Sequence, residues 1–362
     1  MPTFRTIDSV DSAEMDELCD WLRVHSGRWS GVSDWPTETL QACGQAGVYR
    51  WFLPVEMGGF GWSAEDQTRG YLRLSEADLT TTFIITQYMG AIRRIASSSN
   101  EALILRWLES MVSGESFGTL GISHLTTSGR HLSNPILAAK ETDAGFVLDG
   151  LSPWVTGGPH ADVYVVGATL DDGRQILAAA PRNPLAGQIK AHPGYELVAL
   201  SASCTDRVEF DNVLVDDSMM IAGPAENVMQ GGSGARTGGL QTSTLAVGLA
   251  RAAIHFLVDE ATRREDLLEP TSELEKELHQ LEATLIRAAK GEADCDASEI
   301  RGSSNAFVMR ATQAAMTAAK GAGFVEGHRV GRWCQQALFF LVWSCPQNVA
   351  QAHLCELAGV ES

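Results

Sequence analysis

The spacing of apolar residues divides the chain into three blocks. In the first block, residues 11–115, apolar positions recur every three or four residues, which predicts helices. The earliest such run is Met15, Leu18, Cys19 and Leu22. Residues 54–61 interrupt the helices, because a proline and three glycines cannot continue a helix. We therefore predict an N-terminal helical domain over residues 1–115.

After residue 114 the pattern changes to short runs rich in β-branched residues and bounded by turn residues. These runs predict strands at residues 118–125, 135–140, 145–148, 162–168, 175–180 and 207–215. Asp171-Asp172-Gly173, between the fourth and fifth runs, is typical of a hairpin turn. The middle block, residues 116–230, is therefore predicted to be an antiparallel sheet or barrel.

Helical spacing returns after a glycine-rich stretch at residues 231–234. Helices are predicted at residues 240–264, 271–289, 305–320, 330–342 and 347–357. The last domain is thus expected to be helical over residues 231–362. The order of helices, sheet and helices predicts the α+β fold class.

Charge and cysteine content narrow the possible partners and the compartment. The chain has 27 Lys and Arg against 45 Asp and Glu, a formal net charge of −18, which disfavours binding to nucleic acid or to an anionic membrane. The seven cysteines form no C-x-x-C pair, as expected for buried thiols in a reducing compartment. No apolar run approaches the roughly 18 residues that span a bilayer. We expect a cytoplasmic protein without a membrane segment.

Several motifs, in order, carry a resemblance to a known family. Residues 54–61 read PVEMGGFG, residues 150–158 read GLSPWVTGG before Ala161-Asp162, and residues 321–324 read GAGF. Together they resemble the acyl-CoA dehydrogenase superfamily over nearly the whole chain. The resemblance implies an N-terminal helical domain, a middle β domain and a C-terminal four-helix bundle. It also implies FAD bound between the sheet and the C-terminal helices of a homodimer or homotetramer.

The resemblance places Trp154 and Thr156 beside the flavin. An indole offers a flat apolar wall, and a hydroxyl near the reactive ring nitrogen can stabilise the reduced flavin. The alternative interpretation is a buried strand tryptophan followed by a turn threonine. The neighbouring glycines and the Ala161-Asp162 pair favour the flavin role.

Four further residues match cofactor positions of the family. Arg264 matches the arginine that binds the pyrophosphate, although Leu267-Leu268 replaces the Phe-Gly that follows it there, and a solvated arginine is the alternative. Gly321 and Gly323 match the turn that approaches the adenosine half, with a helix C-cap as the alternative. Gln347 matches a position near the cofactor of the neighbouring subunit.

The chain departs from the family at its catalytic base. Counted back from the C-terminal CELAG sequence, Trp343 occupies the position of the usual glutamate. Residues 237–240 read TGGL, so the alternative base position on the helix after the sheet has no acid either. Tryptophan cannot accept the α-proton of an acyl thioester, and loss of a general base costs about 10²- to 10⁴-fold in rate. Either another residue acts as the base or the reaction differs.

His124 is the second departure. It falls at the family's threonine that contacts the pyrimidine edge of the flavin. A histidine there can donate a hydrogen bond to the flavin, stabilise its anionic reduced form or relay a proton. A partly buried strand histidine bonded to the backbone is an equally weighted alternative.

Three functions follow from these residues. The first is an FAD-dependent oxidoreductase that acts, with a non-standard base, on an acyl thioester of CoA or of an acyl-carrier protein, or on a related small organic substrate. The second is a flavin-dependent monooxygenase or oxidase, in which Trp343 shields the reaction from water. The third is a non-catalytic scaffold that no longer binds FAD.

Overall fold

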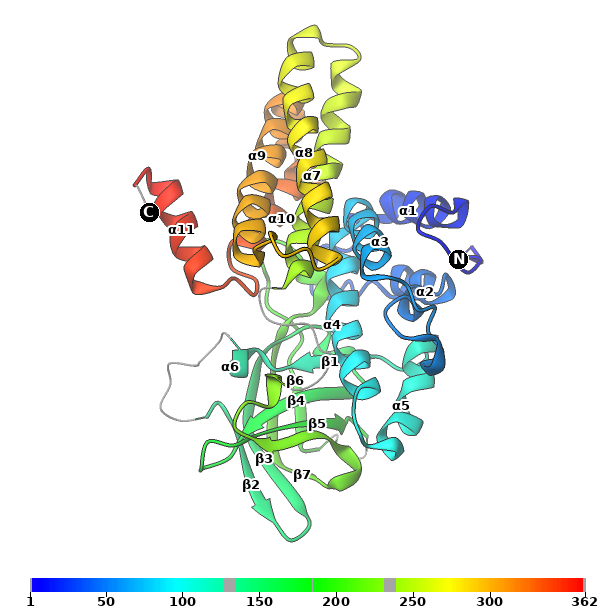
Figure 1. The fold of residues 1–362 in the computed structure, drawn as a ribbon, viewed down its shortest axis with the longest axis vertical. Coiled ribbons are helices and arrows are strands. Elements are labelled where there is room, and N and C mark those ends of the chain that lie inside the picture. The colour runs from blue at the N-terminus through cyan, green and yellow to red at the C-terminus, as the bar shows by residue number, and fades with distance from the viewer. Residues whose placement is uncertain (1, 127–134, 184, 186, 231–238, 361–362) are drawn as a thin grey trace.

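The computed structural model describes residues 2–126, 135–183, 185, 187–230 and 239–360. A block of helices, a sheet and a second block of helices follow one another along the chain (Figure 1). This arrangement confirms the predicted α+β fold class. None of the helices in the described ranges combines the length and apolar character needed to cross a bilayer.

Five α-helices and two short 3-10 turns form the first block. Polar residues begin most of the helices: the side chains of Ser12, Ser63, Asp78 and Asn100 accept hydrogen bonds from the first turns of α1, α3, α4 and α5. The helices are α1 (Ala13–His25), α2 (Thr37–Gln45), α3 (Ala64–Ala77), α4 (Leu79–Ala96) and α5 (Glu101–Ser113). The predicted break at residues 54–61 contains only the turn η2 (Val55–Met57).

The sheet has eight strands in the described ranges, and it is mixed rather than purely antiparallel as predicted. The strands are β1 (Gly118–Gly121), β2 (Leu137–Thr142), β3 (Gly145–Val155), β4 (Val163–Thr169), β5 (Gln175–Pro181), β6 (Ile189–Ala191), β7 (Asp206–Val215) and β8 (Met220–Ala225). Their order is β6-β7-β3-β2-β4-β5-β8, and β1 lies on β4. Both β1 and β2 run parallel to β4, because the chain crosses over between them instead of turning back in a hairpin.

Local turn chemistry was predicted well, and strand ends were predicted less well. The hairpin at Asp171-Asp172-Gly173 joins β4 and β5, with Thr169 opposite Gln175. The strand predicted at residues 118–125 ends at Gly121, and the short helix α6 (Ser123–Thr126) follows. His124 is therefore on a helical turn and not on a strand.

Four helices pack together in the second helical block of the described chain, and a fifth stands to one side of them (Figure 1). The packed helices are α7 (Leu240–Ala261), α8 (Leu268–Ala289), α9 (Ala297–Gly323) and α10 (Arg329–Leu338). The 3-10 turn η8 (Phe339–Leu341) ends α10 early, so the helix predicted at residues 330–342 stops at Leu338. The fifth helix is α11 (Gln347–Ala358), which contacts α9.

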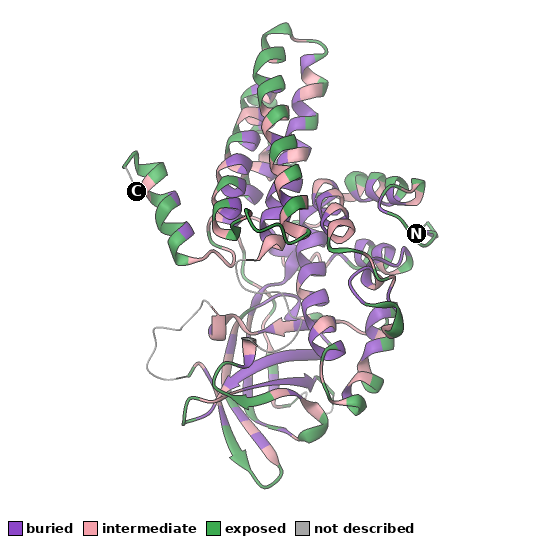
Figure 2. Ribbon diagram, viewed as in Figure 1, coloured by how far each residue is buried: buried purple, intermediate pink, exposed green. Residues whose placement is uncertain are grey.

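Helix α4 joins the three parts of the fold. It is buried over most of its surface (Figure 2) and contacts α3, α5, α7 and β1. Helices α3 and α7 approach closely at Gly248, where the Ser75 hydroxyl donates to the Leu245 carbonyl at 2.7 Å. This packing places polar residues of α4 between the sheet and the bundle.

Candidate active site

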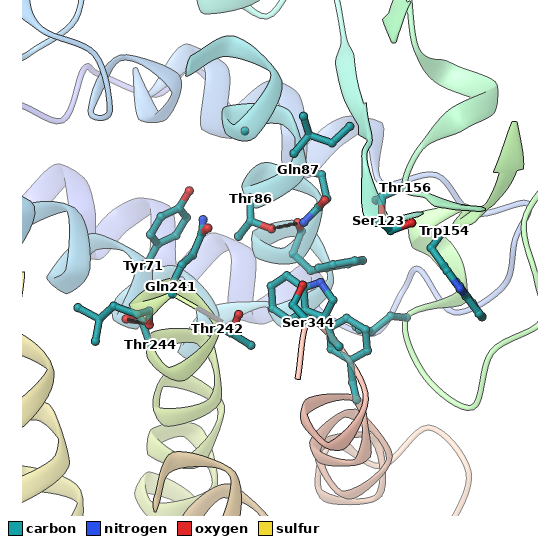
Figure 3. Close-up of a pocket in the computed structure, with 18 of the residues that line it drawn as sticks. Tyr71, Thr86, Gln87, Ser123, Trp154, Thr156, Gln241, Thr242, Thr244 and Ser344 are labelled. Carbon is teal, nitrogen blue, oxygen red and sulfur yellow. Dashed lines mark hydrogen bonds between the residues drawn. The ribbon is translucent and has the colours of Figure 1, made fainter. Parts of the chain in front are cut away.

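A cavity of about 1020 Å³ lies where the N-terminal helices, the sheet and the bundle meet (Figure 3). Its wall combines residues that are far apart in the sequence. Among those labelled in Figure 3, Tyr71 and Gln241 lie on one side of the cavity, Trp154, Thr156 and Ser123 on the opposite side, and Thr86 between them. Tertiary structure, rather than any local motif, creates this site.

Trp154 and Thr156 form part of the sheet side of the wall. Trp154 has a positive φ of 56°, and the pairing of β3 with β7 shifts register between Ser152 and Val155. Such an irregularity redirects a side chain. The indole of Trp154 remains 53% exposed, and its ring lies 5.5 Å from that of Tyr195.

Thr156 is buried within a chain of hydroxyl groups. Its Oγ1 lies 3.0 Å from Thr205 Oγ1, which lies 2.8 Å from Ser203 Oγ. The Thr119 hydroxyl donates to the Thr156 carbonyl at 2.6 Å. These bonds fix the position of the strand end at the cavity.

One face of α4 forms the opposing wall. Phe83, Thr86, Gln87, Gly90, Arg93 and Arg94 all line the cavity, at a spacing that puts them on one side of a helix. Gln87 Nε2 donates to Thr86 Oγ1 at 3.0 Å, and Thr86 Oγ1 donates to the Phe83 carbonyl at 2.6 Å. Gly90 allows β1 to approach, since a Cβ there would lie 2.5 Å from Leu120 Cδ1.

Trp343 lies in the same wall, within an aromatic cluster that we define as Phe83, Phe339 and Trp343. Its ring stacks on Phe339 with centroids 5.0 Å apart and meets Phe83 edge to face, also at 5.0 Å. The buried Arg301 donates to the carbonyl of Trp343 at 2.7 Å and to that of Phe340 at 3.0 Å. The position that the family resemblance gives to a glutamate therefore presents an indole to the cavity.

The described part of the cavity wall contains no Asp, Glu or His. Its charged side chains are Arg93 and Arg94, and burial together with the charge of Arg93 lowers the pKa of Arg94 to about 10. Burial raises the pKa of the Tyr71 hydroxyl, which the charge of Arg93 opposes. A tyrosine with a raised pKa is a poor base near neutral pH. The described wall thus offers positive charge and hydroxyl groups, but no conventional general base.

His124 does not line this cavity. Its Nε2 lies 2.7 Å from the Gly167 carbonyl, and burial lowers its pKa. Nδ1 is buried and has no hydrogen-bond partner among the described residues. This geometry matches the alternative interpretation, a buried histidine bonded to the backbone, and a role at the flavin stays a prediction.

Arg264, Gly321 and Gly323 come together at a different place, outside the cavity wall. Arg264 Nη1 donates to the Ala318 carbonyl at 2.7 Å, one turn before Gly321. Helix α9 breaks at Lys320, whose φ of 56° and ψ of −148° are not helical. Three residues predicted to bind the adenosine and pyrophosphate of a cofactor are therefore neighbours.

Gln347 is exposed at the first turn of α11 and lies outside the cavity wall. Helix α11 stands to one side of the bundle (Figure 1) and contacts α9. Contact with the cofactor of a neighbouring subunit stays a prediction for this residue.

The sequence interpretation missed the polar face of α4 and its partners Tyr71 and Gln241. A signal was present, because Thr86, Gln87 and Arg94 are polar residues at helical spacing within a helix that is largely apolar after its first turn. It was not recognised because polar residues on one stripe of a helix normally indicate the solvent side. Here the helix is central, and the stripe faces a cavity instead.

Comparison with known proteins identifies similar chains. Residues 21–115 match the family model of the acyl-CoA dehydrogenase N-terminal domain. The chain is 26% identical, over 274 residues, to mitochondrial isovaleryl-CoA dehydrogenase of Oryza sativa subsp. japonica. The match covers 69% of this chain and 65% of that relative, slightly less than two thirds of the relative's length.

Two solved structures show the same fold. A glutaryl-coenzyme A dehydrogenase in complex with glutaryl-CoA has a TM-score of 0.80 at 18% identity, with 97% of this chain and 96% of that chain covered. FMN-bound TdsC from Paenibacillus sp. A11-2 has a TM-score of 0.73 at 16% identity, with 89% and 90% covered. The architecture is thus shared almost from end to end, although the sequences have diverged widely.

Proposed function

Since the chain belongs to the acyl-CoA dehydrogenase superfamily, we propose that it is an FAD-dependent oxidoreductase with its flavin against Trp154 and Thr156. The observation that carries this proposal is the cavity of about 1020 Å³ with Trp154 and Thr156 on its sheet side. A cavity of this size accommodates a ring system together with a small substrate. The partly exposed indole of Trp154 is a suitable surface for a flat aromatic ring.

The chain's own residues hold and shield the reacting groups. FAD, when bound, supplies a two-electron acceptor. Trp154 forms a stacking surface, and the hydroxyl chain through Thr205 fixes the Thr156 backbone and hydroxyl beside it. The aromatic cluster excludes water from the opposite wall. The substrate is proposed to be an acyl thioester of CoA or of an acyl-carrier protein, or a related small organic molecule.

The described wall contains no carboxylate that could remove a proton from the substrate, so the base in this proposal is non-standard. Tyr71, Ser123 and Ser344 are the lining hydroxyls closest in chemistry to a proton acceptor, and none is ionised at neutral pH without activation. A substrate whose C–H bond is already acidic, or which carries its own basic atom, fits this wall best.

A flavin-dependent oxidase or monooxygenase is the second candidate. The same observations favour it: a described wall without carboxylates and an aromatic cluster that makes part of that wall apolar. The rate at which reduced protein is reoxidised by O₂ separates the two candidates. Reoxidation that is slow compared with turnover supports the dehydrogenase, and reoxidation fast enough for turnover supports the oxidase or monooxygenase.

The absorption spectrum of the purified protein tests the cofactor. We expect flavin bands, with FAD recovered after heat release, and partial bleaching when substrate is added without oxygen. Trp154→Ala should weaken FAD binding by about fivefold or more, because a stacking surface contributes roughly 1 kcal/mol or more. Trp107→Ala is the matched control, since Trp107 lies on α5 outside the cavity wall. A colourless protein that cannot be reconstituted would support the scaffold hypothesis.

We further propose a homodimer or homotetramer in which Arg264, Gly321, Gly323 and Gln347 contact the cofactor of a neighbouring subunit. The supporting observation is that Arg264 and the two glycines lie together, yet apart from the cavity of their own chain. Arg264→Met should lower FAD affinity without changing the near-ultraviolet circular dichroism of the cavity tryptophans. A monomer in solution with normal FAD affinity would contradict this arrangement.

A further inference from the structure

We infer that the side of the cavity opposite Trp154 binds a carboxylate at the far end of the substrate, through Arg93 with Tyr71 and Gln241. This inference rests on the proposed function, and it specifies the substrate class as a short acyl group that ends in a carboxylate. An acyl group ending in a methyl is the alternative that the experiment excludes.

The charge of the described cavity wall is the first argument. Arg93 and Arg94 contribute two positive charges, and the described lining includes no acidic residue. This contrasts with the whole chain, whose formal net charge is −18. A positive cavity in a strongly acidic protein favours an anionic ligand over an apolar one.

The depth of these groups is the second argument. Arg94 is 5% exposed and Tyr71 is 6% exposed. Burying a guanidinium costs free energy, which a bound anion offsets. Both arginines also have contacts within the chain, for example Arg94 Nη1 with the Gly90 carbonyl at 3.0 Å. A guanidinium carries five N–H donors and can therefore contact its own chain and a ligand together.

The polar neighbours of Arg93 are the third argument. The Tyr71 hydroxyl is buried and makes no hydrogen bond of normal geometry with the described residues. Gln241 lies beside Tyr71 in the cavity wall (Figure 3), and the charge of Arg93 lowers the pKa of this hydroxyl against the larger effect of burial. A phenol, an amide and a guanidinium in the wall of one cavity are donors that a carboxylate accepts from.

The position of Tyr71 and Gln241 in the cavity indicates that they contact the acyl end, and not the CoA end, of a thioester. Tyr71 and Gln241 lie across the cavity from Trp154 and Thr156 (Figure 3). With the reacting carbon beside Trp154, a short acyl chain extends toward Tyr71. Tyr71 is 6% exposed and Trp154 is 53% exposed, so the bulky phosphates of CoA would remain on the more exposed Trp154 side. Arg93 would therefore contact the acyl terminus.

Calorimetric titration of the holoprotein with two matched thioesters tests the inference. Glutaryl-CoA and valeryl-CoA have the same acyl length and differ only in a terminal carboxylate or methyl. We expect glutaryl-CoA to bind at least tenfold more tightly, as hydrogen bonds to a charged group typically provide. Arg93→Met should bring the ratio of the two Kd values close to 1, while Arg93→Lys should restore part of the preference.

Two further variants keep the test decisive. Arg106→Met is the matched control, because Arg106 is an exposed arginine on α5 outside the cavity wall, and it should keep the wild-type ratio. Tyr71→Phe removes only the hydroxyl and should lower the ratio about fivefold, which preserves the test if Arg93→Met does not fold. Equal wild-type affinities, or a ratio unchanged in both Arg93→Met and Tyr71→Phe, would overturn the inference.

The outcome for the proposed function is measured separately. The flavin spectrum of the same samples reports on FAD, whereas calorimetry needs no flavin signal. A flavin-containing protein that binds both thioesters equally refutes the carboxylate site alone. A protein that binds neither thioester refutes both the carboxylate site and the thioester substrate, and its spectrum still decides the cofactor.

Discussion

Replacing Trp343 with glutamate would return a carboxylate to the wall from which the family resemblance says it is missing. The backbone at this position is held independently of the indole, since Arg301 donates to the Trp343 carbonyl at 2.7 Å and Asn305 Nδ2 donates to the Phe340 carbonyl at 3.0 Å. A new side chain therefore starts from the same place and points toward the cavity. Trp343→Gln is the matched control, because it differs from Trp343→Glu only in the carboxylate.

The expected magnitudes follow from the contacts of the ring. Both variants lose the stacking on Phe339 and the edge contact with Phe83, each worth about 0.5–1.5 kcal/mol, so unfolding free energy should fall by roughly 1–3 kcal/mol in both. The positive charges of Arg93 and Arg94 favour an ionised carboxylate in this cavity. A general base contributes about 10²- to 10⁴-fold, so Trp343→Glu should reduce flavin with an acyl-CoA at least about 10²-fold faster than Trp343→Gln.

Anaerobic stopped-flow bleaching of the flavin band, measured across pH, is the assay. The rate in Trp343→Glu should rise with pH through the carboxyl pKa, and the rate in Trp343→Gln should not. Chemical denaturation of both variants checks that their stabilities are similar. Equal rates in two equally stable variants would refute the reasoning that Trp343 occupies the niche of a base.

Three other predictions concern the fold and its titrating groups. Gly248→Ala should destabilise the protein by about 1–3 kcal/mol in urea unfolding, because a Cβ would lie 2.7 Å from both Leu72 O and Ser75 Cβ where α3 meets α7. Burial lowers the pKa of His124 below 6.5, so the unfolded chain binds a proton at His124 more tightly than the folded protein does. The melting temperature should therefore decrease as the pH is lowered below about 6.5, and this decrease should be smaller in His124→Asn. Burial raises the pKa of Cys19 to about 12, so mass spectrometry should find Cys19 unmodified by iodoacetamide at about pH 8 unless the protein is unfolded.

The order of helices, sheet and helices could be read from the sequence because it depends on local periodicity. Apolar spacing of three to four residues indicated the helices, and β-branched runs indicated most of the strands. Strands β6 and β8 were missed because one has three residues and the other contains Gly223 and Pro224. The parallel pairing of β1 and β2 with β4 was missed because pairing partners far apart in sequence leave no local signal.

Only part of the candidate site could be predicted from the sequence. Motif matching placed Trp154, Thr156 and Trp343 in one site, and the structure brings all three to one cavity. For His124 it gave equal weight to a flavin contact and to a buried histidine bonded to the backbone, and the ring lies beside the Gly167 carbonyl, while the flavin contact stays a prediction. The sequence after Gly121 is compatible with either a strand or a helix. The direction in which His124 faces therefore depends on tertiary packing.

The sequence alone determined the fold class and the acidic net charge, since each depends on residue type and local spacing. It also carries the prediction that Trp343 stands where the family resemblance places a glutamate. Tertiary structure alone decided that polar residues of α4 face a cavity rather than solvent. It also decided that this cavity is positively charged inside an acidic protein. The physical reason is that the exposure and electrostatic environment of a helix face depend on what packs against it, and for α4 those partners come from α3, α7 and β1.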